Sequence, residues 1–451
     1  MLTELATAVH RGDVTPLDLV EESLRRIDAA ADLGAVVRIE AESALAEAKA
    51  HDRVGPLAGI PLLVKDGPSV AGSVTTLGSR LHADDPPDTD DDVVVARLRA
   101  AGAIVVGRTN SPEFAHTLVS HNSLHGTTRN PWNTDASPGG SSGGSTAALA
   151  AALAPLATTS DGGGSIRIPA AACGLLGLKP TMGTVGRNHL PRWIEFSTQG
   201  ATGRSVADVA LELGVIAGPA PGDWTSVPLG TARLSPERPV RVLACRTFRA
   251  DVDPVVEAAV EHALELLGSD GLEVTRVEAP SSARELGHWF TISAAELAQS
   301  LAHRRDEWDL LDDTTRLTVE FGASVTADRY IAAQRSRHEL GARIDALLGD
   351  DAVLVLPTLN VQWWPPEGPA PDAAGSVTGD PTIAVNTPEI NATGHPAASV
   401  PVGVGDTGVP IGMQVIAPRF REGLALGVAE VVERLRPWPT VAPGYEPFPV
   451  P

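Results

Sequence analysis

Two glycine-rich stretches carry serines in a setting that suits nucleophilic chemistry. Residues 139–145 read GGSSGGS, and residues 160–167 read SDGGGSIR. A serine hydroxyl becomes a good nucleophile only when a base lies within hydrogen-bonding reach. Attack on an amide carbonyl also builds charge on oxygen, which preorganised N–H groups stabilise, and glycines let neighbouring amides converge. We therefore interpret Ser165 as a candidate nucleophile. The predicted oxyanion donors are the N–H groups of Gly162, Gly163, Gly164 and Ser165.

The candidate base is a lysine at the end of an apolar run. Lys65 follows the residues IPLLV. Burial disfavours the ammonium form of a lysine and lowers its pKa, so a buried lysine can accept a proton. The sequence fits equally well a lysine that snorkels at a strand end or pairs with Asp66. Asp161 could hold the glycine loop by accepting N–H bonds, or it could form an ordinary Asx turn.

Three other interpretations of the glycine-rich region fit the sequence less well. A flexible linker has polar flanks, but residues 139–145 run directly into the helix-forming TAALAAALAPLA. A phosphate-binding loop needs a lysine after its last glycine, and no dinucleotide-type spacing follows a strand either. GSSGG matches the nucleophile elbow with Ser142 at its centre, but the preceding RNPWNTDASP reads as a turn rather than a strand.

Strands and helices alternate along the chain. Thr15 and Pro16 form an N-cap pair that opens a helix through about Ile27. Helices are also predicted for AESALAEAKAHD, DDDVVVARLRAAG, DPVVEAAVEHALELLGSDG and REGLALGVAEVVERLR. Strands are predicted for GIPLLVKD, AIVVG, RPVRVLACR, LEVTRVEAP, DAVLVLPT, AASVPVGV and PIGMQVIA. This alternation indicates an α/β protein with a parallel or mixed sheet covered on both faces.

Composition narrows the classes of partner. The chain has 451 residues, of which 43% are hydrophobic, and a formal net charge of −21. This charge argues against a nucleic acid held by a basic face. The N-terminus does not read as a signal peptide, and the longest apolar run is too short to cross a bilayer. With only two cysteines, far apart, we expect a cytoplasmic protein without a membrane, metal or cofactor partner.

Residues 138–181 resemble the signature of the amidase signature family of serine hydrolases. This segment reads PGGSSGGSTAALAAALAPLATTSDGGGSIRIPAAACGLLGLKPT, and AGIPLLVKD resembles the family's lysine strand. The resemblance covers the chain from about residue 15 to 436. It implies one amidase domain over 1–451, an α/β/α sandwich around a large twisted mixed sheet. N-terminal helices would occupy about 1–50, the signature core about 55–215, and a variable part about 216–451.

The resemblance also implies a serine–cis-serine–lysine triad. Matched residue by residue, the nucleophile is Ser165, the bridging serine is Ser141 and the base is Lys65. A non-proline cis peptide would join Gly140 to Ser141. Supporting roles would fall to Ser142, Asp161 and Arg167, which leaves no place for the nucleophile elbow.

One departure from the family pattern concerns Gly162. Many members carry a larger residue at this position. We expect the glycine to keep the backbone donor, to loosen the loop and to widen the site there.

Substrate choice is expected to lie in the segments 187–200, 283–308 and 362–381. Four aromatic residues there could line an apolar acyl pocket or simply pack in the core or on the surface: Trp193, Phe196, Trp289 and Trp363. Arg192 or Arg304 could instead bind a substrate carboxylate. The predicted activity is hydrolysis of a small-molecule carboxamide, without a cofactor. The alternative is a glutaminase subunit of a tRNA-dependent amidotransferase, and family analogy leaves a homodimer open.

Overall fold

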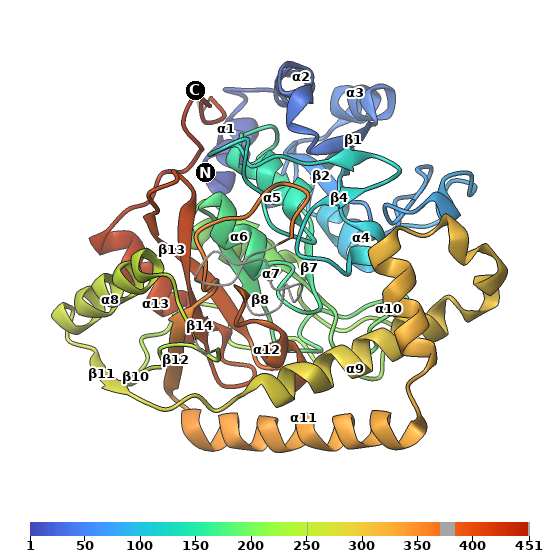
Figure 1. The fold of residues 1–451 in the computed structure, drawn as a ribbon. Coiled ribbons are helices and arrows are strands. Elements are labelled where there is room, and N and C mark those ends of the chain that lie inside the picture. Colours follow the sequence, from blue (N-terminus) through green and yellow to red (C-terminus); the bar gives the residue numbers. More distant parts are fainter. Residues whose placement is uncertain (250, 370–383, 450–451) are drawn as a thin grey trace.

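A computed structural model of the protein describes residues 1–249, 251–369 and 384–449 (Figure 1). Within these residues the strands form two main sheets and one hairpin. The larger sheet has the order β11-β10-β12-β14-β13-β8-β9-β7, and the smaller sheet has the order β1-β3-β2-β6. Parallel pairs such as β2 with β3 occur beside antiparallel pairs such as β13 with β14, so the sheet is mixed, as predicted.

The elements alternate along the chain much as the sequence predicts. The strands are β1 (Val36–Ile39), β2 (Pro61–Lys65), β3 (Ile104–Thr109), β4 (His121–Asn122), β5 (Gly126–Thr127), β6 (Leu156–Ala157), β7 (Thr159–Asp161), β8 (Leu176–Lys179), β9 (Thr198–Gly203), β10 (Arg241–Ala244), β11 (Glu273–Arg276), β12 (Ala352–Pro357), β13 (Ala397–Val404) and β14 (Pro410–Ile416). The α-helices are α1 (Leu2–Arg11), α2 (Pro16–Ala29), α3 (Ala41–Ala50), α4 (Val93–Ala100), α5 (Gly143–Ala150), α6 (Arg167–Cys173), α7 (Val206–Ile216), α8 (Pro254–Ser269), α9 (Ala283–Ser300), α10 (Asp313–Ala323), α11 (Ala327–Leu348), α12 (Pro388–Thr393) and α13 (Glu422–Leu435).

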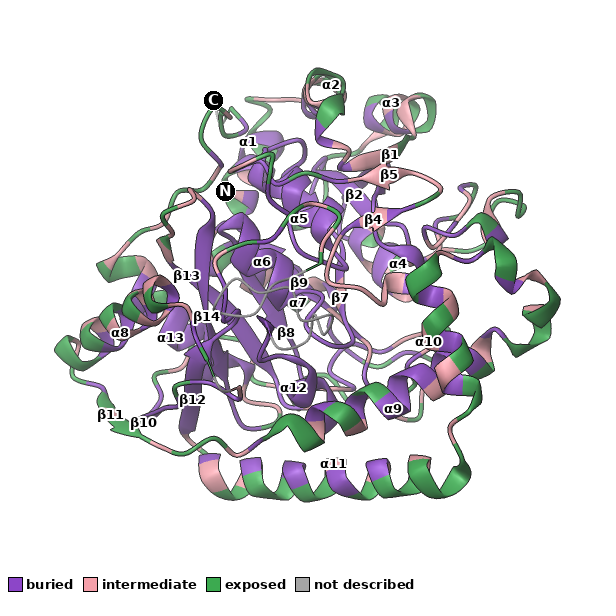
Figure 2. Cartoon of the chain, viewed as in Figure 1, coloured by how far each residue is buried: buried purple, intermediate pink, exposed green. Residues whose placement is uncertain are grey.

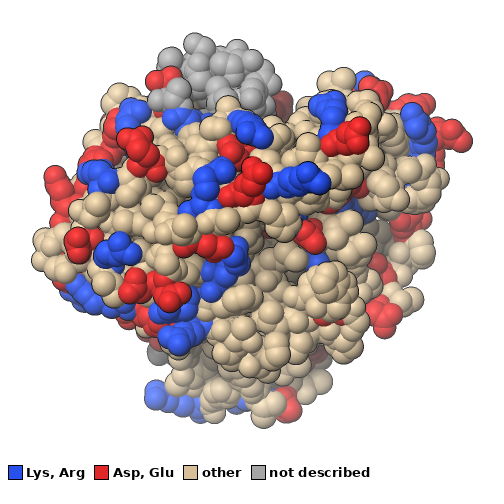
Figure 3. All heavy atoms as spheres, turned by 90° about the horizontal axis from the view of Figure 1, so that it is seen from below, with Lys and Arg blue, Asp and Glu red and all other residues tan. Residues whose placement is uncertain are grey.

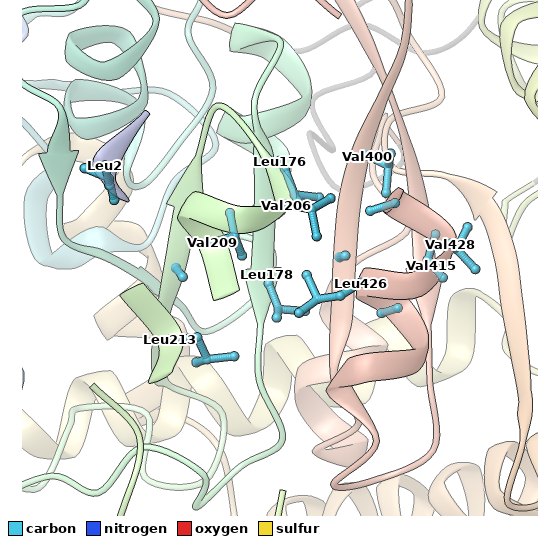
Figure 4. Packing of buried hydrophobic residues seen from close by; sticks show 14 of the residues in the cluster. Leu2, Leu176, Leu178, Val206, Val209, Leu213, Val400, Val415, Leu426 and Val428 are labelled. Atoms are coloured by element: carbon cyan, nitrogen blue, oxygen red, sulfur yellow. The ribbon is translucent and has the colours of Figure 1, made fainter. Parts of the chain in front are cut away.

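Helices cover both faces of the larger sheet. Side chains alternate along β8: Leu176 and Leu178 pack with α7 and α13, while a Cβ on Gly177 would touch Ala170 of α6. Figure 4 shows the first of these layers, with Val206 of α7 and Leu426 of α13 approaching the strands. The layered α/β/α architecture that the resemblance implies is therefore present.

The helices differ in how far they are buried. Every residue of α5 and of α6 is buried, because both helices lie in the middle of the molecule (Figure 2). The long helix α11 instead presents a buried stripe and an exposed side, the pattern of an amphipathic surface helix. None of the helices in the described parts of the chain is long and apolar enough to cross a membrane.

The two sheets are joined by one continuous segment, residues 156–161. Its first part, β6, pairs in parallel with β2, and its last part, β7, pairs with β9 of the larger sheet. Parallel strands end at the same edge of a sheet. The carboxyl end of β2, which carries Lys65, therefore lies beside the end of residues 156–161, from which the glycine loop continues.

Candidate active site

Lys65 is buried at the end of β2 and is surrounded by serine hydroxyls. Its side chain is 1% exposed. Its Nζ lies 2.7 Å from Oγ of Ser141, 3.0 Å from Oγ of Ser142 and 3.1 Å from Oγ of Ser160. The three N–H groups of a protonated lysine thus each have one hydroxyl oxygen as acceptor.

Burial lowers the pKa of Lys65 to about 7, although the negative charges of Asp161 and Asp66 act in the opposite direction. About half of the lysine is then a neutral amine at neutral pH. The hydroxyl of Ser142 donates to the carbonyl of Ser160, so its oxygen can only accept from Lys65. When the lysine loses its proton, its free lone pair can therefore face Ser141.

The loop before α5 brings Ser141 to the lysine. The peptide bond between Gly140 and Ser141 is cis, as the resemblance implies. A Cβ on Gly140 would lie 2.8 Å from the backbone of residues 117–119, so this close approach needs a glycine. The next residue, Ser142, donates its backbone N–H to the carbonyl oxygen of Ser165 at 3.2 Å, which ties the two serine segments together.

Ser165 opens into a cavity of about 1010 Å³. Its side chain is 7% exposed, and it lines this cavity together with Gly163. Among the described residues the contact between the two serine segments is the backbone bond from Ser142. The hydroxyls of Ser141 and Ser165 do not bond directly.

The glycine loop is held by a buried ion pair. Arg167 Nε donates to Oδ2 of Asp161 at 2.9 Å, and Nη2 donates to Oδ1 at 2.9 Å, with both side chains fully buried. Burial alone would raise the pKa of Asp161, but the Arg167 charge and hydrogen bonds outweigh it and hold that pKa well below its usual range. Arg167 also donates to Gln414, Asn391 and the Thr387 carbonyl, so the buried charge is well compensated.

One predicted oxyanion donor is already engaged. The N–H of Gly164 donates to Oδ1 of Asp161 at 2.7 Å, in the manner expected of a carboxylate that orders a turn. This removes Gly164 from the predicted set of donors. For the N–H groups of Gly162, Gly163 and Ser165, the described part of the chain supplies no acceptor.

Two indoles and a threonine pack against the three glycines. A Cβ on Gly162 would lie 2.4 Å from the Trp193 ring, and a Cβ on Gly163 would lie 2.4 Å from the Trp289 ring. Thr387 fills the corresponding space at Gly164 and donates to the carbonyl of Gly163 at 2.7 Å. The expectation that Gly162 loosens the loop and widens the site is therefore wrong, because the Trp193 ring occupies the space.

The four predicted aromatic residues separate into two pairs. Trp193 and Trp289 line the Ser165 cavity, with their rings edge to face at 5.6 Å between centroids. Phe196 is buried behind Trp289, stacked on it at 6.4 Å, and is not among the described residues that line the cavity. The same is true of Trp363, which is 37% exposed because Trp364 takes the buried position beside it.

The expectation of a loop over the pocket is met in part by described residues. In the segment 362–381, Glu367, Gly368 and Pro369 line the cavity, whereas residues 370–381 lie outside the described residues. The two arginines considered for a substrate carboxylate do not line this cavity. Arg304 pairs with Glu307, and Arg192 faces another cavity.

Sequence reasoning missed three residues of the site. Ser160 touches Lys65, Thr387 packs on the glycine loop, and Asn391 donates to Asp161 at 2.8 Å. Ser160 could have been found, because β7 places alternate residues on one face and Ser160 directly precedes Asp161. Thr387 and Asn391 come from the distant segment around α12, and nothing in the local sequence connects them to the loop.

A buried lysine among hydroxyls, a serine at a cavity and a clamped glycine loop together describe a hydrolase site. A family model described as Amidase matches residues 18–426. The glutamyl-tRNA(Gln) amidotransferase A-chain protein of Thioalkalivibrio sulfidiphilus (strain HL-EbGR7) is 35% identical, over 99% of each chain. The solved structure of 6-aminohexanoate cyclic dimer hydrolase with its substrate is 30% identical, with a TM-score of 0.88 over 98% of each chain. The peptide amidase from Stenotrophomonas maltophilia is 28% identical, with a TM-score of 0.82 over 96% of each chain.

The chain belongs to the amidase signature family, and it is an amide-hydrolysing enzyme.

Proposed function

We propose that this enzyme hydrolyses the C–N bond of a small-molecule carboxamide through an acyl-enzyme on Ser165. Neutral Lys65 takes a proton from Ser141, and Ser141 takes the proton of Ser165 as its Oγ attacks the carbonyl carbon. The protons return through Ser141 to the leaving ammonia or amine. Water then hydrolyses the ester and regenerates Ser165. The 2.7 Å contact between Lys65 and Ser141 is the observation that carries this proposal.

The negative oxygen of the tetrahedral intermediate is assigned to the glycine loop. The N–H groups of Gly162, Gly163 and Ser165 are the donors that have no acceptor in the described part of the chain. The Trp193, Trp289 and Thr387 contacts hold the loop in place, so the donors need little reorganisation when charge develops.

The character of the cavity supports an amide with an apolar portion. Its wall beside Ser165 is formed largely by apolar and aromatic side chains, including Leu118, Val119, Leu286, Trp289 and Phe290. The charged residues that reach it are engaged elsewhere: Arg249 pairs with Glu389 at 2.6 Å, and Glu113 accepts from Ser79 at 2.5 Å. An apolar group would be desolvated favourably there, whereas a charged group would find few free partners.

A second candidate is the glutaminase component of a tRNA-dependent amidotransferase. The observation in its favour is the identity of 35% to the corresponding component of such an enzyme along almost the whole chain. In this case the amide would be glutamine, and partner proteins would receive the ammonia.

The experiment is ammonia or amine release from a panel of amides. The panel contains aliphatic, aryl, amino-acid, dicarboxylic and ureido amides together with glutamine. Ser165→Ala is the test variant, and Ser269→Ala, at an exposed serine of α8, is the matched control. We expect turnover of one class with an apolar portion, abolished in Ser165→Ala and unchanged in Ser269→Ala.

Two outcomes would redirect the proposal. Turnover of glutamine alone, or silence until partner proteins are added, would favour the amidotransferase component. Full turnover in a folded Ser165→Ala protein would show that Ser165 is not the nucleophile.

A further inference from the structure

A second cavity lies on the other side of the segment that carries Trp193. Its volume is about 820 Å³, and it is lined by residues of the 190–194 segment, of α9 and of the region from η4 (Ala302–Leu310) to the start of α11. Lys65, Ser141 and Ser165 are not among its described lining residues. Trp193 faces the Ser165 cavity, whereas its neighbours Arg192 and Ile194 face this one.

Arg192 brings a positive charge to this cavity without a carboxylate partner in the described residues. Its Nε is buried and has no hydrogen-bond partner, and its guanidinium lies over the Phe114 ring at 4.9 Å. Burial lowers the pKa of Arg192 to about 10, and no nearby acid acts on it, so the side chain stays charged at neutral pH. In the same region Arg304 pairs with Glu307 and Arg337 pairs with Glu195.

Arg305 adds a second cation to the same cavity. It is exposed, and its guanidinium lies over the Trp308 ring at 5.2 Å. Stacking occupies the flat face of a guanidinium and leaves its N–H edge available. That edge matches the two oxygens of a carboxylate. Both arginines are therefore arranged to bind an anion while their faces rest on aromatic rings.

The acidic residue of the described lining does not neutralise these cations. Glu296 accepts from the Tyr330 hydroxyl at 2.7 Å and from the backbone N–H of Ile194 at 2.8 Å, so both oxygens are occupied. Burial raises the pKa of Glu296, which weakens its negative charge further. The remaining wall includes apolar groups such as Leu190, Ile194 and Val325.

We propose that this cavity is a second binding site, for a small organic carboxylate with an apolar body. The carboxylate would lie between Arg192 and Arg305, and the body would lie against the apolar wall and Trp308. Amide hydrolysis releases a carboxylate, so a ligand of this class forms wherever the enzyme works. Binding at this site does not depend on which residue is the nucleophile, so it can be tested without turnover.

The test is calorimetric titration of the whole chain with benzoate. We expect saturable binding that weakens by about tenfold or more in Arg192→Gln, because a bidentate charge-assisted pair is lost. Arg192→Lys keeps the charge but not the two-pronged edge, and it should bind with intermediate affinity. Arg335→Gln removes an exposed arginine of α11 outside the cavity and should leave the affinity unchanged.

Two further arms locate the site and define the ligand. Trp289→Ala alters the Ser165 cavity, and we expect it to leave benzoate binding unchanged. Inorganic phosphate, which has no apolar body, should bind more weakly than benzoate. The proposal is overturned if the wild type shows no saturable binding, if folded Arg192→Gln and Arg192→Lys both bind like the wild type, if Trp289→Ala abolishes binding, or if phosphate binds as tightly as benzoate.

Discussion

Two buried lysines, at the ends of β2 and β8, share almost every property except their partners. Lys65 and Lys179 are each 1% exposed, and each ends its strand. Burial is the main cause that lowers the pKa of both to about 7. Lys65, however, contacts three serine hydroxyls, whereas Lys179 donates to the backbone carbonyl of Pro180 at 2.9 Å.

The difference shows that a lowered pKa does not by itself make a lysine a base. A backbone carbonyl has no proton to give, so the amine of Lys179 can only donate to it. A hydroxyl can donate and accept, so the proton that Lys65 accepts can come from Ser141. Of these two lysines, Lys65 is the one placed for proton transfer, and Lys179 serves the fold of the larger sheet.

The largest expected effect separates the two lysines by substitution. Methionine matches lysine in length and keeps the packing of a buried chain. We expect Lys65→Met to lower kcat/KM by on the order of 1000-fold, within the range that general-base catalysis contributes. Lys179→Met should stay within about threefold of the wild type, because its packing is preserved. Steady-state kinetics on the preferred amide, with thermal unfolding as a check on folding, would decide. Equal losses in both variants would remove the distinction.

The pH dependence of the rate sharpens the same comparison. Lys65 must be neutral to accept a proton, and burial places its pKa at about 7. We therefore expect kcat/KM to rise by about tenfold between pH 6 and pH 8 and to level off above, as the neutral fraction approaches one. Lys179→Met should keep this profile, since its group does not take part. A profile that is flat from pH 6 to 8 in the wild type, or that flattens in Lys179→Met, would contradict the assignment.

A smaller effect is expected from the hydroxyls around Lys65. Ser160 lies 3.1 Å from Nζ and helps to orient the neutral amine so that its lone pair faces Ser141. Ser160→Ala should lower kcat/KM by about tenfold, the loss expected for one orienting hydrogen bond of roughly 1.4 kcal/mol. Thr159→Val, at a neighbouring buried hydroxyl that bonds Thr202 instead, is the matched control. Equal kinetics for Ser160→Ala and the wild type would show that Ser141 and Ser142 suffice.

The smallest expected effect is one on stability and leaves turnover nearly unchanged. Lys179 has a folded pKa of about 7 against an ordinary value of 10.5, so between these values the unfolded chain binds more protons. Its contribution to stability is therefore most unfavourable below pH 7 and improves as pH rises towards 10. The free energy of unfolding of the wild type, measured against Lys179→Met by denaturant titration, should rise by a few kcal/mol at most from pH 7 to pH 10. Parallel pH dependences for the two proteins would contradict the buried, neutral state of Lys179.

The surface supports the sequence-based expectation about large partners in one respect. On the face in Figure 3, which is the underside of Figure 1 where α11 lies, basic and acidic side chains are intermixed and do not gather into a patch of one sign. Such a face offers no continuous basic track for a phosphate backbone.

Local sequence patterns predicted elements better than their partners. The threonine–proline pair at residues 15–16 forms the cap and first residue of α2, with the capping box complete. The apolar run before Lys65 forms β2, and every residue of that strand is buried. By contrast β1, a short strand with two exposed residues, was not predicted, because it lacks both an apolar run and alternation.

The family, the alternating α/β order and the candidate triad can all be read from the amino-acid sequence. These features are local or follow from a long motif, so they survive without knowledge of contacts. Which amides of the glycine loop are free depends on the folded chain, because Asp161 engages Gly164 through its side chain. The fold also places Trp193 in the space beside Gly162 and brings hydroxyls to Lys65 but not to Lys179. The last two facts depend on the relative placement of segments far apart in the chain, and packing around the joined sheets fixes that placement.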